Sequence, residues 1–313
     1  MVDARFIAGD WGTSHLRLML CDAQGRILDL IDGPGAAAAR GAFADIFDAL
    51  VAGWLRRDRE LPTILCGMVG ASFGWTPVPY RSCPASPEQI ASSCAELRDG
   101  RIRLVPGLSC RNRLEAPDFL RGEETQILGA LRLQPELLRG RHLLCLPGTH
   151  TKWVVLEDGS VSEFLTAPAG ELYELLCRHS VLVRDQAGGT PAHDAAAFAQ
   201  GLQRYRPTAA AGLLQQLFEC RSRRLSGELA GASAASFLSG LLIANDVGGA
   251  LQLFAGAISA GTVHLIGSPE LMRLYSMALA SHGCTPQSID GSAASLAGLL
   301  QLSQLILPGA LTP

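Results

Sequence analysis

The sequence lacks a surplus of charge of either sign, because 26 Lys and Arg residues stand against 29 Asp and Glu. Proteins that bind nucleic acids or anionic membranes usually carry a basic excess, so neither partner is expected. At 313 residues, of which 48% are hydrophobic and 18% charged, the chain is long and apolar enough for two domains that each bury a core. A small molecule is therefore the expected substrate.

The sequence also lacks cysteines at the spacing of a metal clip. Its nine cysteines are spread singly, and their odd number argues against a disulfide framework. Cys21, Cys66 and Cys145 interrupt apolar runs, where a free thiol behaves as a small hydrophobe. Free thiols persist in a reducing compartment, and the first residues hold no apolar segment of signal-peptide type, so we expect a cytoplasmic protein.

A hydrophobic run of membrane-spanning length is missing as well. The apolar stretch 251–267 holds about 17 residues and contains Gln252 and His264, whereas a spanning helix needs about 20. We interpret this stretch as core.

The hydrophobic periodicity predicts two halves, each of which opens with a β-hairpin and continues into helices. Asp158-Gly159 signals a hairpin turn, and Ser86-Pro87 and Ser268-Pro269 signal helix starts. The expected strands are 6–9, 15–21, 26–31, 63–69, 102–105, 143–146, 153–156, 161–165 and 263–267. The expected helices are 43–54, 122–133, those beginning at Ser86 and Ser268, and a final one from about Ser295. We expect domains at 1–139 and 140–313, with the final helix packing back on the first.

A turn rich in glycine and hydroxyl groups joins the first two strands, at 9–14 (Gly-Asp-Trp-Gly-Thr-Ser). Gly12 lets the backbone approach an anion, and Thr13 and Ser14 add donors. Asp10 can hold a magnesium ion through water as the phosphate charge shifts. The pattern predicts a phosphate site, although an ordinary Gly-Asp hairpin has the same pattern.

A second such turn, 147–153 (Pro-Gly-Thr-His-Thr-Lys-Trp), stands at the matching place of the second half. Gly148, Thr149 and Thr151 repeat the first pattern. Lys152 and His150 add the positive charge and donors that a transferring phosphoryl group needs. The recurrence indicates two phosphate-binding elements.

Three further motifs complete a recognisable set: 66–70 (Cys-Gly-Met-Val-Gly), 121–126 (Arg-Gly-Glu-Glu-Thr-Gln) and 239–243 (Ser-Gly-Leu-Leu-Ile). Together with the two turns, they resemble the 2-dehydro-3-deoxygalactonokinase family of the actin-like ATPase and sugar kinase superfamily. The resemblance covers Phe6 to about Leu279. It implies a two-domain actin-like (ribonuclease H-like) α/β fold with an interdomain cleft for ATP and Mg²⁺. It also implies phosphorylation of the 6-hydroxyl of 2-dehydro-3-deoxy-D-galactonate, in galactonate catabolism.

One departure concerns the metal. The second phosphate loop of the superfamily usually begins with Asp, and the position near Pro147 has none. Asp10 is therefore the expected magnesium-associated carboxylate. From the residues alone, without the resemblance, the expectation is a phosphotransferase of the actin-like class.

The resemblance also places a general base where a helix opens before the second domain. A base there accepts the proton of the attacking hydroxyl and is typically worth about 10²- to 10⁴-fold in rate. Glu123 is the first candidate, Glu124 the second and Asp118 the third. The alternative is that the two glutamates only complement the helix N-terminus.

A sugar acid needs cationic donors for its carboxylate. Arg81, in the polar stretch 79–84 that we interpret as an irregular loop, can form a fork with it, and Arg121 and His150 are competitors. For any one of these candidates, a surface residue without a role is the more common outcome.

The resemblance implies adenosine contacts at Gly267 and Ser268, where a strand passes into a helix. Such junctions also occur for steric reasons alone, and we expect His264 on that strand to be a core residue.

Other activities stay open. A phosphatase-like member would use the same glutamate to activate water, and another sugar-acid kinase of the superfamily would share both turns. A sugar-sensing regulator usually carries an added DNA-binding helix-turn-helix, and a first strand beginning by Phe6 leaves no room for one. The preferred epimer and a homodimeric state are also left open.

Overall fold

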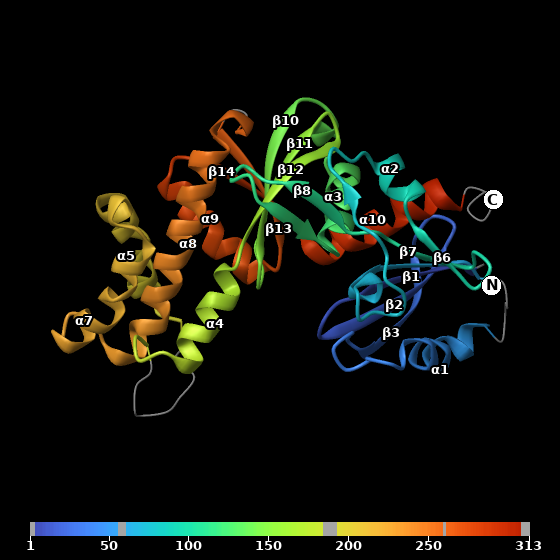
Figure 1. Ribbon diagram of the computed structural model, residues 1–313, viewed down its shortest axis with the longest axis horizontal. Coiled ribbons are helices and arrows are strands. Elements are labelled where there is room, and N and C mark those ends of the chain that lie inside the picture. Colours follow the sequence, from blue (N-terminus) through green and yellow to red (C-terminus); the bar gives the residue numbers. More distant parts are fainter. Residues whose placement is uncertain (1–3, 56–60, 184–192, 259–260, 308–313) are drawn as a thin grey trace. The chain divides into compact units, whose positions relative to one another are not determined.

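The structure is a computed structural model that describes residues 4–55, 61–183, 193–258 and 261–307. The chain divides into two compact units that each contain strands and helices (Figure 1). Unit 1 comprises Met1–Gly140, Leu156–Phe164 and Ile289–Pro313, and unit 2 comprises Arg141–Val155 and Leu165–Ser288. The last helix is thus part of unit 1, although it follows unit 2 in the sequence.

A six-stranded sheet in the order β3-β2-β1-β4-β7-β6 forms the centre of unit 1. The first three strands form an antiparallel meander, and β1, β4 and β7 are parallel. The strands are β1 (Ala4–Trp11), β2 (His15–Asp22), β3 (Ile27–Pro34), β4 (Thr63–Gly67), β6 (Ala95–Leu97) and β7 (Ile102–Leu104). Because β1 and β4 are parallel, the residues that follow them meet at one edge of the sheet, where open α/β sheets bind ligands.

Helix α1 (Phe43–Leu55) packs on this sheet through a face of four buried residues, Phe43, Phe47, Val51 and Trp54. Their spacing of three and four residues is that of one helical face. The Trp54 indole N–H donates to Asp29 Oδ2 at 2.9 Å and ties the helix to β3. The expected helix 43–54 is confirmed.

A three-stranded sheet, β5-β8-β9, corrects one expectation. The stretch around Arg81 was expected to be an irregular loop, but β5 (Arg81–Ser82) pairs in parallel with β8 (Leu108–Arg111). Strand β9 (Pro117–Leu120) completes the sheet. Two residues are too few to show the alternation by which a strand is recognised in a sequence.

The remaining helices of unit 1 include the pair that supports the sheet edge. Helix α3 (Glu123–Leu133) and the final helix α10 (Gly291–Ile306) approach so closely that a Cβ on Gly129 would collide with the backbone of Ala294. Helix α10 begins at Gly291 rather than near Ser295, because Asp290 accepts from the Ala293 N–H at 2.8 Å and caps it. The others are α2 (Pro87–Ser92), η1 (Met68–Gly70) and η2 (Pro135–Leu138).

A second, five-stranded sheet has the order β12-β11-β10-β13-β14, and unit 2 contains β10, β13 and most of β11 and β14. Strands β10 and β13 are parallel, and β10 leads into the second glycine-rich turn. The strands are β10 (Arg141–Leu146), β11 (Thr151–Glu157), β12 (Ser160–Ala167), β13 (Thr262–Gly267) and β14 (Thr285–Asp290). Strand β14 was not expected, because the region after the second hairpin was interpreted as helical apart from 263–267. Its residues are mostly polar and mostly exposed, as in a loop.

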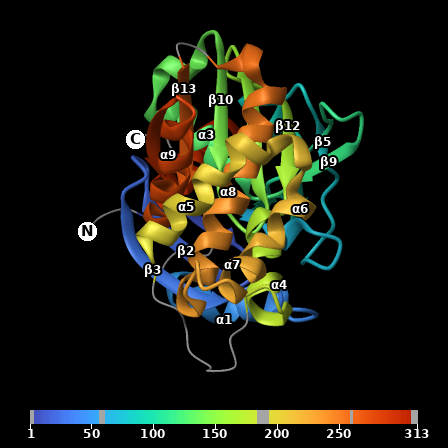
Figure 2. The same cartoon turned by 90° about the vertical axis from the view of Figure 1, so that its left-hand side faces the viewer.

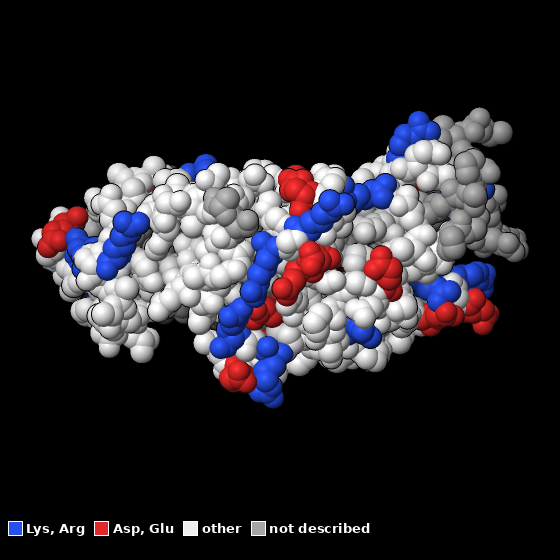
Figure 3. Space-filling model, turned by 90° about the horizontal axis from the view of Figure 1, so that it is seen from above, with Lys and Arg blue, Asp and Glu red and all other residues white. Residues whose placement is uncertain are grey.

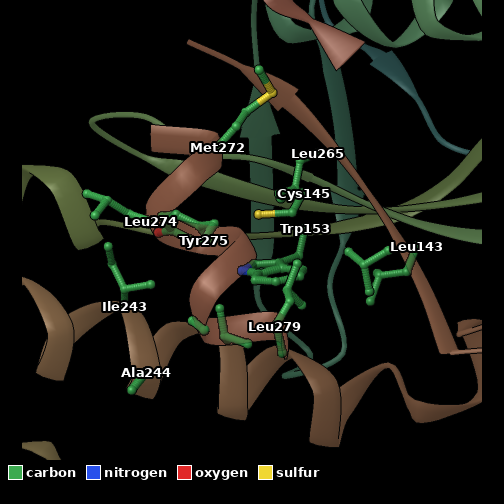
Figure 4. Packing of buried hydrophobic residues seen from close by; sticks show 14 of the residues in the cluster. Leu143, Cys145, Trp153, Ile243, Ala244, Leu265, Met272, Leu274, Tyr275 and Leu279 are labelled. Atoms are coloured by element: carbon green, nitrogen blue, oxygen red, sulfur yellow. The ribbon is translucent and has the colours of Figure 1, made fainter. Parts of the chain in front are cut away.

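Helices pack against this sheet and bury a core that contains Cys145, Trp153, Leu265 and Tyr275 (Figure 4). Helices α5 and α8 lie side by side, and glycines at 201 and 240 allow the close approach (Figure 2). The helices are α4 (Ala169–His179), α5 (Ala195–Thr208), η3 (Ala209–Ala211), α6 (Leu213–Leu217), α7 (Glu219–Leu225), η4 (Gly231–Ser233), α8 (Ala234–Leu253), η5 (Ala255–Ala257) and α9 (Pro269–Ser281).

Helix α8, with the turn before it, is long and apolar enough to cross a membrane by length and composition alone. However, 72% of an apolar 18-residue window in that segment is buried inside the fold, as in the core helix of a globular protein. On the face shown in Figure 3, acidic and basic side chains occur in mixed groups among uncharged residues. All nine cysteines lie in the described part of the chain and are free thiols.

Candidate functional site

The sheet edge of unit 1 places Asp10 beside Cys66, because these residues are direct partners in the parallel pairing of β1 and β4. Cys66 and Ser295 form hydrogen bonds with the Asp10 carboxylate. Burial raises the pKa of Asp10, the nearby Glu123 raises it further, and Arg17 lowers it. A cation bound to this carboxylate would offset the unfavourable effect of burial on its charged form.

Backbone contacts with residues 35–37 fix the turn that follows Asp10. The carbonyl groups of Gly12 and Thr13 accept hydrogen bonds from the amides of Ala36 and Ala37, at 2.9 and 3.0 Å. Gly35 packs so closely on the turn that a Cβ there would collide with the backbone of Ser14. The side chains of Thr13 and Ser14 are exposed. The turn is thus fixed in shape, while the two residues that carry its hydroxyl groups are exposed.

The start of α3 lies at the same edge. Gly122 has a φ of 105°, and a Cβ on it would contact the Gly67 Cα at 3.6 Å. The backbone N–H of Arg121 donates to Glu123 Oε2 at 3.0 Å. Glu123 is half-buried and lies close enough to Asp10 to affect its pKa. Asp10 and Glu123, predicted from separate motifs, are therefore neighbours.

Glu124 has a different environment, although it is the next residue. It is fully buried, and its carboxylate accepts from the Gly122 N–H at 2.6 Å and from Thr125 Oγ1 at 3.2 Å. Burial, with a contribution from Glu123, raises the pKa of Glu124 to about 8. Glu124 is therefore mostly protonated at neutral pH and enclosed by the fold, which favours Glu123 as the base that meets a substrate.

Asp118 is engaged in the hairpin between β8 and β9. Its carboxylate accepts from Asn112 Nδ2 at 3.0 Å and from the Phe119 N–H at 2.9 Å. Asn112 Oδ1 in turn accepts from the amides of Leu114 and Ala116. These contacts suit a residue that stabilises the hairpin, so Asp118 stays the third candidate.

Two arginines lie near the three-stranded sheet. Arg121 stacks on the Tyr80 ring at 4.4 Å and donates from Nη2 to the Val78 carbonyl at 2.7 Å. Its Nε and Nη1 are buried and, within the described residues, have no hydrogen-bond partner; the same holds for Arg81 Nε. Arg81 and the residue before Arg121 both pair with Leu108, so the two arginines flank one strand. Buried donors without acceptors are costly, which favours an anionic ligand here.

A small cavity of about 100 Å³ adjoins Asp10. Its walls come from β1, β2, α3 and α10, all within unit 1. Its lining residues are Asp10, Arg17, Met19, Gln126, Gly291, Ser292, Ser295 and Leu296. Among the described residues, no group of three or more His, Cys, Asp or Glu could hold a metal ion. A single carboxylate nevertheless fits Mg²⁺, which usually keeps several waters and binds through one or two carboxylates plus substrate phosphates.

In unit 2, the parallel pairing of β10 with β13 brings two predicted segments together. Cys145 pairs with Leu265, so the turn after β10 and the junction after β13 lie at one sheet edge. Gly267 stands next to Pro147, because a Cβ on Gly267 would lie 3.6 Å from the Pro147 carbonyl oxygen, and Ser268 follows it. His264 is buried on β13, as expected for a core residue.

Contacts with Gly170 and Glu171 fix the second turn in the same way. The Glu171 amide donates to the Thr149 carbonyl at 2.9 Å, and His150 Nε2 lies 2.8 Å from Glu171 Oε2. Gly170 packs against the backbone of Gly148, where a Cβ would collide. Thr149 and His150 are exposed, and the space beside the Gly148 Cα is open among the described residues.

Thr151 and Lys152 lie in strand β11 rather than in the turn. Thr151 is fully buried, and its hydroxyl lies 2.8 Å from the Tyr275 hydroxyl. Lys152 is only 4% exposed and donates to the His150 carbonyl at 3.4 Å. Thr151 is thus placed to support the turn from inside the fold.

Asp246 was not among the residues predicted from the sequence. Its carboxylate accepts from Trp153 Nε1 at 2.8 Å and from the Tyr275 hydroxyl at 2.6 Å. Burial raises the pKa of Asp246 to about 6. One signal was available, because Asp246 is the only charged residue in the 20 residues of α8. Cys66 and Ser295 were not predicted as partners of Asp10 either, since the residues alone do not give strand register or helix packing.

Comparison with known proteins gives one consistent result. Residues 10–302 match the model of the 2-keto-3-deoxy-galactonokinase family. The chain is 39% identical to the protein named "Probable 2-dehydro-3-deoxygalactonokinase DgoK1" of Rhizobium meliloti, over 97% of this chain and 98% of that one. It is 32% identical to the 2-dehydro-3-deoxygalactonokinase of Escherichia coli, over 97% of this chain and 99% of that one.

Solved structures agree on the fold. A crystal structure of a candidate 2-dehydro-3-deoxygalactonokinase from Sinorhizobium meliloti superposes with a TM-score of 0.87 at 38% identity, covering 97% of this chain and 99% of that one. Component A of the (R)-2-hydroxyglutaryl-CoA dehydratase of Acidaminococcus fermentans gives 0.52 at 10% identity, covering 94% and 96%, which concerns the fold alone. The expected mixed α/β fold of the actin-like class is confirmed.

Proposed function

Because this chain belongs to the 2-keto-3-deoxy-galactonokinase family, we propose that it transfers the γ-phosphoryl group of ATP to the 6-hydroxyl of 2-dehydro-3-deoxy-D-galactonate. The observation that carries this proposal is that two carboxylates, Asp10 and the half-buried Glu123, lie within electrostatic range of each other at the sheet edge of unit 1. A phosphotransferase needs one carboxylate to position the metal–phosphate group and another to accept a proton.

Asp10 is the residue that would hold Mg²⁺, which neutralises phosphate charge when bound. The exposed hydroxyl groups of Thr13 and Ser14 would donate to phosphate oxygens, as would those of the second turn through Thr149. Lys152 adds positive charge to that turn. The junction of Gly267 and Ser268, beside Pro147, is the proposed contact for adenosine.

Glu123 is the proposed general base. The O6–P bond forms as the bond between the γ-phosphorus and the bridging oxygen breaks, the hydroxyl proton passes to Glu123, and ADP leaves. Glu124 is enclosed by the fold and mostly protonated at neutral pH, so it is not placed to take that proton. This division of roles follows from the difference in burial between the two residues.

The substrate carboxylate is the proposed partner of Arg121 and Arg81. The Arg121 guanidinium is oriented by Tyr80 and by the Val78 carbonyl, and it keeps donors that lack an acceptor within the described residues. A planar guanidinium matches a carboxylate with two parallel hydrogen bonds. His150 is a weaker candidate, because it already pairs with Glu171.

The proposed setting is sugar-acid catabolism in the cytoplasm, where ATP and reduced thiols are available. ADP release is the direct test, measured by a coupled assay with a panel of 2-keto-3-deoxy sugar acids that includes both C4 epimers. We expect release only when an acceptor is present, and fastest with 2-dehydro-3-deoxy-D-galactonate. Release at the same rate without any sugar acid would instead indicate a phosphatase-like enzyme.

A further inference from the structure

A buried hydrogen-bonded chain lies behind the second turn, entirely within unit 2. Asp246 on α8 accepts from the Trp153 indole of β11 and from the Tyr275 hydroxyl of α9. Tyr275 in turn contacts the Thr151 hydroxyl, at the first residue of β11. Figure 4 shows Tyr275 and Trp153 side by side next to the helix that carries Ile243 and Ala244. One carboxylate therefore joins three elements.

The donors and acceptors fix the direction of each bond. An indole N–H can only donate, and a tyrosine has one hydroxyl proton. The Tyr275 proton goes to Asp246 Oδ2 at 2.6 Å, so the Thr151 hydroxyl, which lies 2.8 Å from the Tyr275 oxygen and also interacts with Asp246, points its hydrogen at one of these two buried acceptors. The hydrogen of Thr151 is thus directed into the core, and the side chain has one defined orientation.

The hydrogen-bonded side chains lie next to both segments of unit 2 that are proposed to contact the nucleotide, the turn 148–150 and the junction at Ser268. Thr151 directly follows the turn 148–150, and α9 directly follows Ser268. Tyr275 and Trp153 are 2% and 0% exposed, so the network is shielded from water. A need for stability alone does not explain a buried carboxylate at this position, because well-packed apolar residues often stabilise a fold equally well or better. A fixed geometry is the property that such a network adds.

We propose that Asp246 is a positioning residue for the turn 148–150, acting through Tyr275 and Thr151 to hold the start of β11 in the geometry that binds the phosphates of the nucleotide. The proposal rests on the proposed function, because it takes this turn to be a nucleotide-binding element. Asp246 touches no ligand itself and acts only through the two hydroxyl groups and the indole.

The test compares Tyr275→Phe, Thr151→Val and the double variant, with Asp246→Asn as a fourth protein. The matched control is Tyr205→Phe, which makes the same chemical change in a tyrosine that packs on the same core and against Gly248 of α8. The measurements are calorimetric binding of a non-hydrolysable ATP analogue, KM for ATP and for the sugar acid, and the thermal midpoint.

Each single substitution in the hydrogen-bonded network should weaken binding of the ATP analogue by about 3- to 10-fold, the effect of one lost hydrogen bond. The double variant should bind no worse than the weaker single variant, because both changes break the same link. KM for the sugar acid should not change. Tyr205→Phe should bind the analogue like the wild type, and where Tyr275→Phe fails to fold, Thr151→Val carries the test with little change in volume.

Two results would overturn the proposal. Equal analogue binding by the wild type and all folded variants, even with lowered thermal midpoints, would make the network merely structural. Additive losses in the double variant would show that Thr151 acts independently of Tyr275. Failure of the proposed function is seen separately and earlier, because the wild type itself would then bind no analogue; that result overturns both proposals.

Discussion

Glu123 and Glu124 are consecutive residues at the start of α3, yet Glu124 is fully buried while Glu123 is half-buried beside Asp10. Consecutive residues point about 100° apart around a helix, so one fold can enclose one and leave the other at the sheet edge. The two carboxyl groups thereby differ in protonation as well as in access, and this difference underlies the first two predictions.

Glu123→Gln should lower kcat by about 10²-fold or more and leave KM for ATP and the sugar acid nearly unchanged, because a general base acts mainly in the transition state. Glutamine keeps the size and the acceptor for the Arg121 N–H. Steady-state kinetics of Glu123→Gln and Glu124→Gln decide the assignment. An inactive Glu124 variant beside a healthy Glu123 variant would reverse it, and two active variants would move the search to Asp118.

Glu124 should make the protein less stable as the pH rises. Its pKa is about 8 in the folded protein, above the usual value of 4.5, so the folded state binds the extra proton. The stability it contributes is complete below about pH 4.5 and is lost as the pH rises toward 8. Thermal melting of the wild type and Glu124→Gln from pH 5 to 8.5 tests this, since each pKa unit is worth about 1.4 kcal/mol. The midpoint of the wild type should fall relative to that of the variant. Parallel curves would contradict the assignment of this proton.

Asp10→Asn should keep the fold and lose most turnover, because asparagine preserves the turn but not the charge that positions Mg²⁺. The substitution removes the energetic cost of burying a carboxylate, so the thermal midpoint of the variant should be equal to or above that of the wild type. Turnover is measured at saturating magnesium. Near wild-type kcat there would remove Asp10 from the metal site.

Arg121→Met should raise KM for the sugar acid by about 10- to 100-fold, the range expected for a charged hydrogen-bonded pair, with little effect on KM for ATP. Methionine retains part of the packing on Tyr80. Arg113→Met is the matched control, because Arg113 belongs to the same unit and pairs with Glu163. A rise in KM for ATP instead of the sugar acid would place Arg121 on the nucleotide.

Lys152→Ala should weaken binding of ATP far more than binding of the sugar acid alone. The side chain extends from β11 to the His150 carbonyl, at the turn proposed to hold phosphate. Calorimetry with each ligand separately measures both effects. An equal loss for the two ligands, or a loss for the sugar acid only, would assign Lys152 to the acceptor.

The sequence was informative where chemistry and periodicity coincide. Asp10, Gly148 and the two glutamates stood out because turn residues between apolar strands are recognisable locally, and the helix 43–54 because its apolar spacing is regular. The short strand at Arg81 and strand β14 were missed, since each lacks an apolar alternation. The difference between Glu123 and Glu124 was only partly predictable, because burial of one of them depends on tertiary contacts. Asp246 was overlooked, since nothing in its local sequence indicates that Trp153 and Tyr275 converge on it.

The central claim is transfer of phosphate from ATP to one hydroxyl group of one sugar acid, and the product itself tests it most directly. The purified protein is incubated with ATP, Mg²⁺ and 2-dehydro-3-deoxy-D-galactonate, and the product is examined by ³¹P NMR with proton coupling. We predict one phosphomonoester whose phosphorus couples to the two protons of C6, formed in equal amount to ADP. Inorganic phosphate in place of the ester, or ADP formed equally without the sugar acid, would contradict the account.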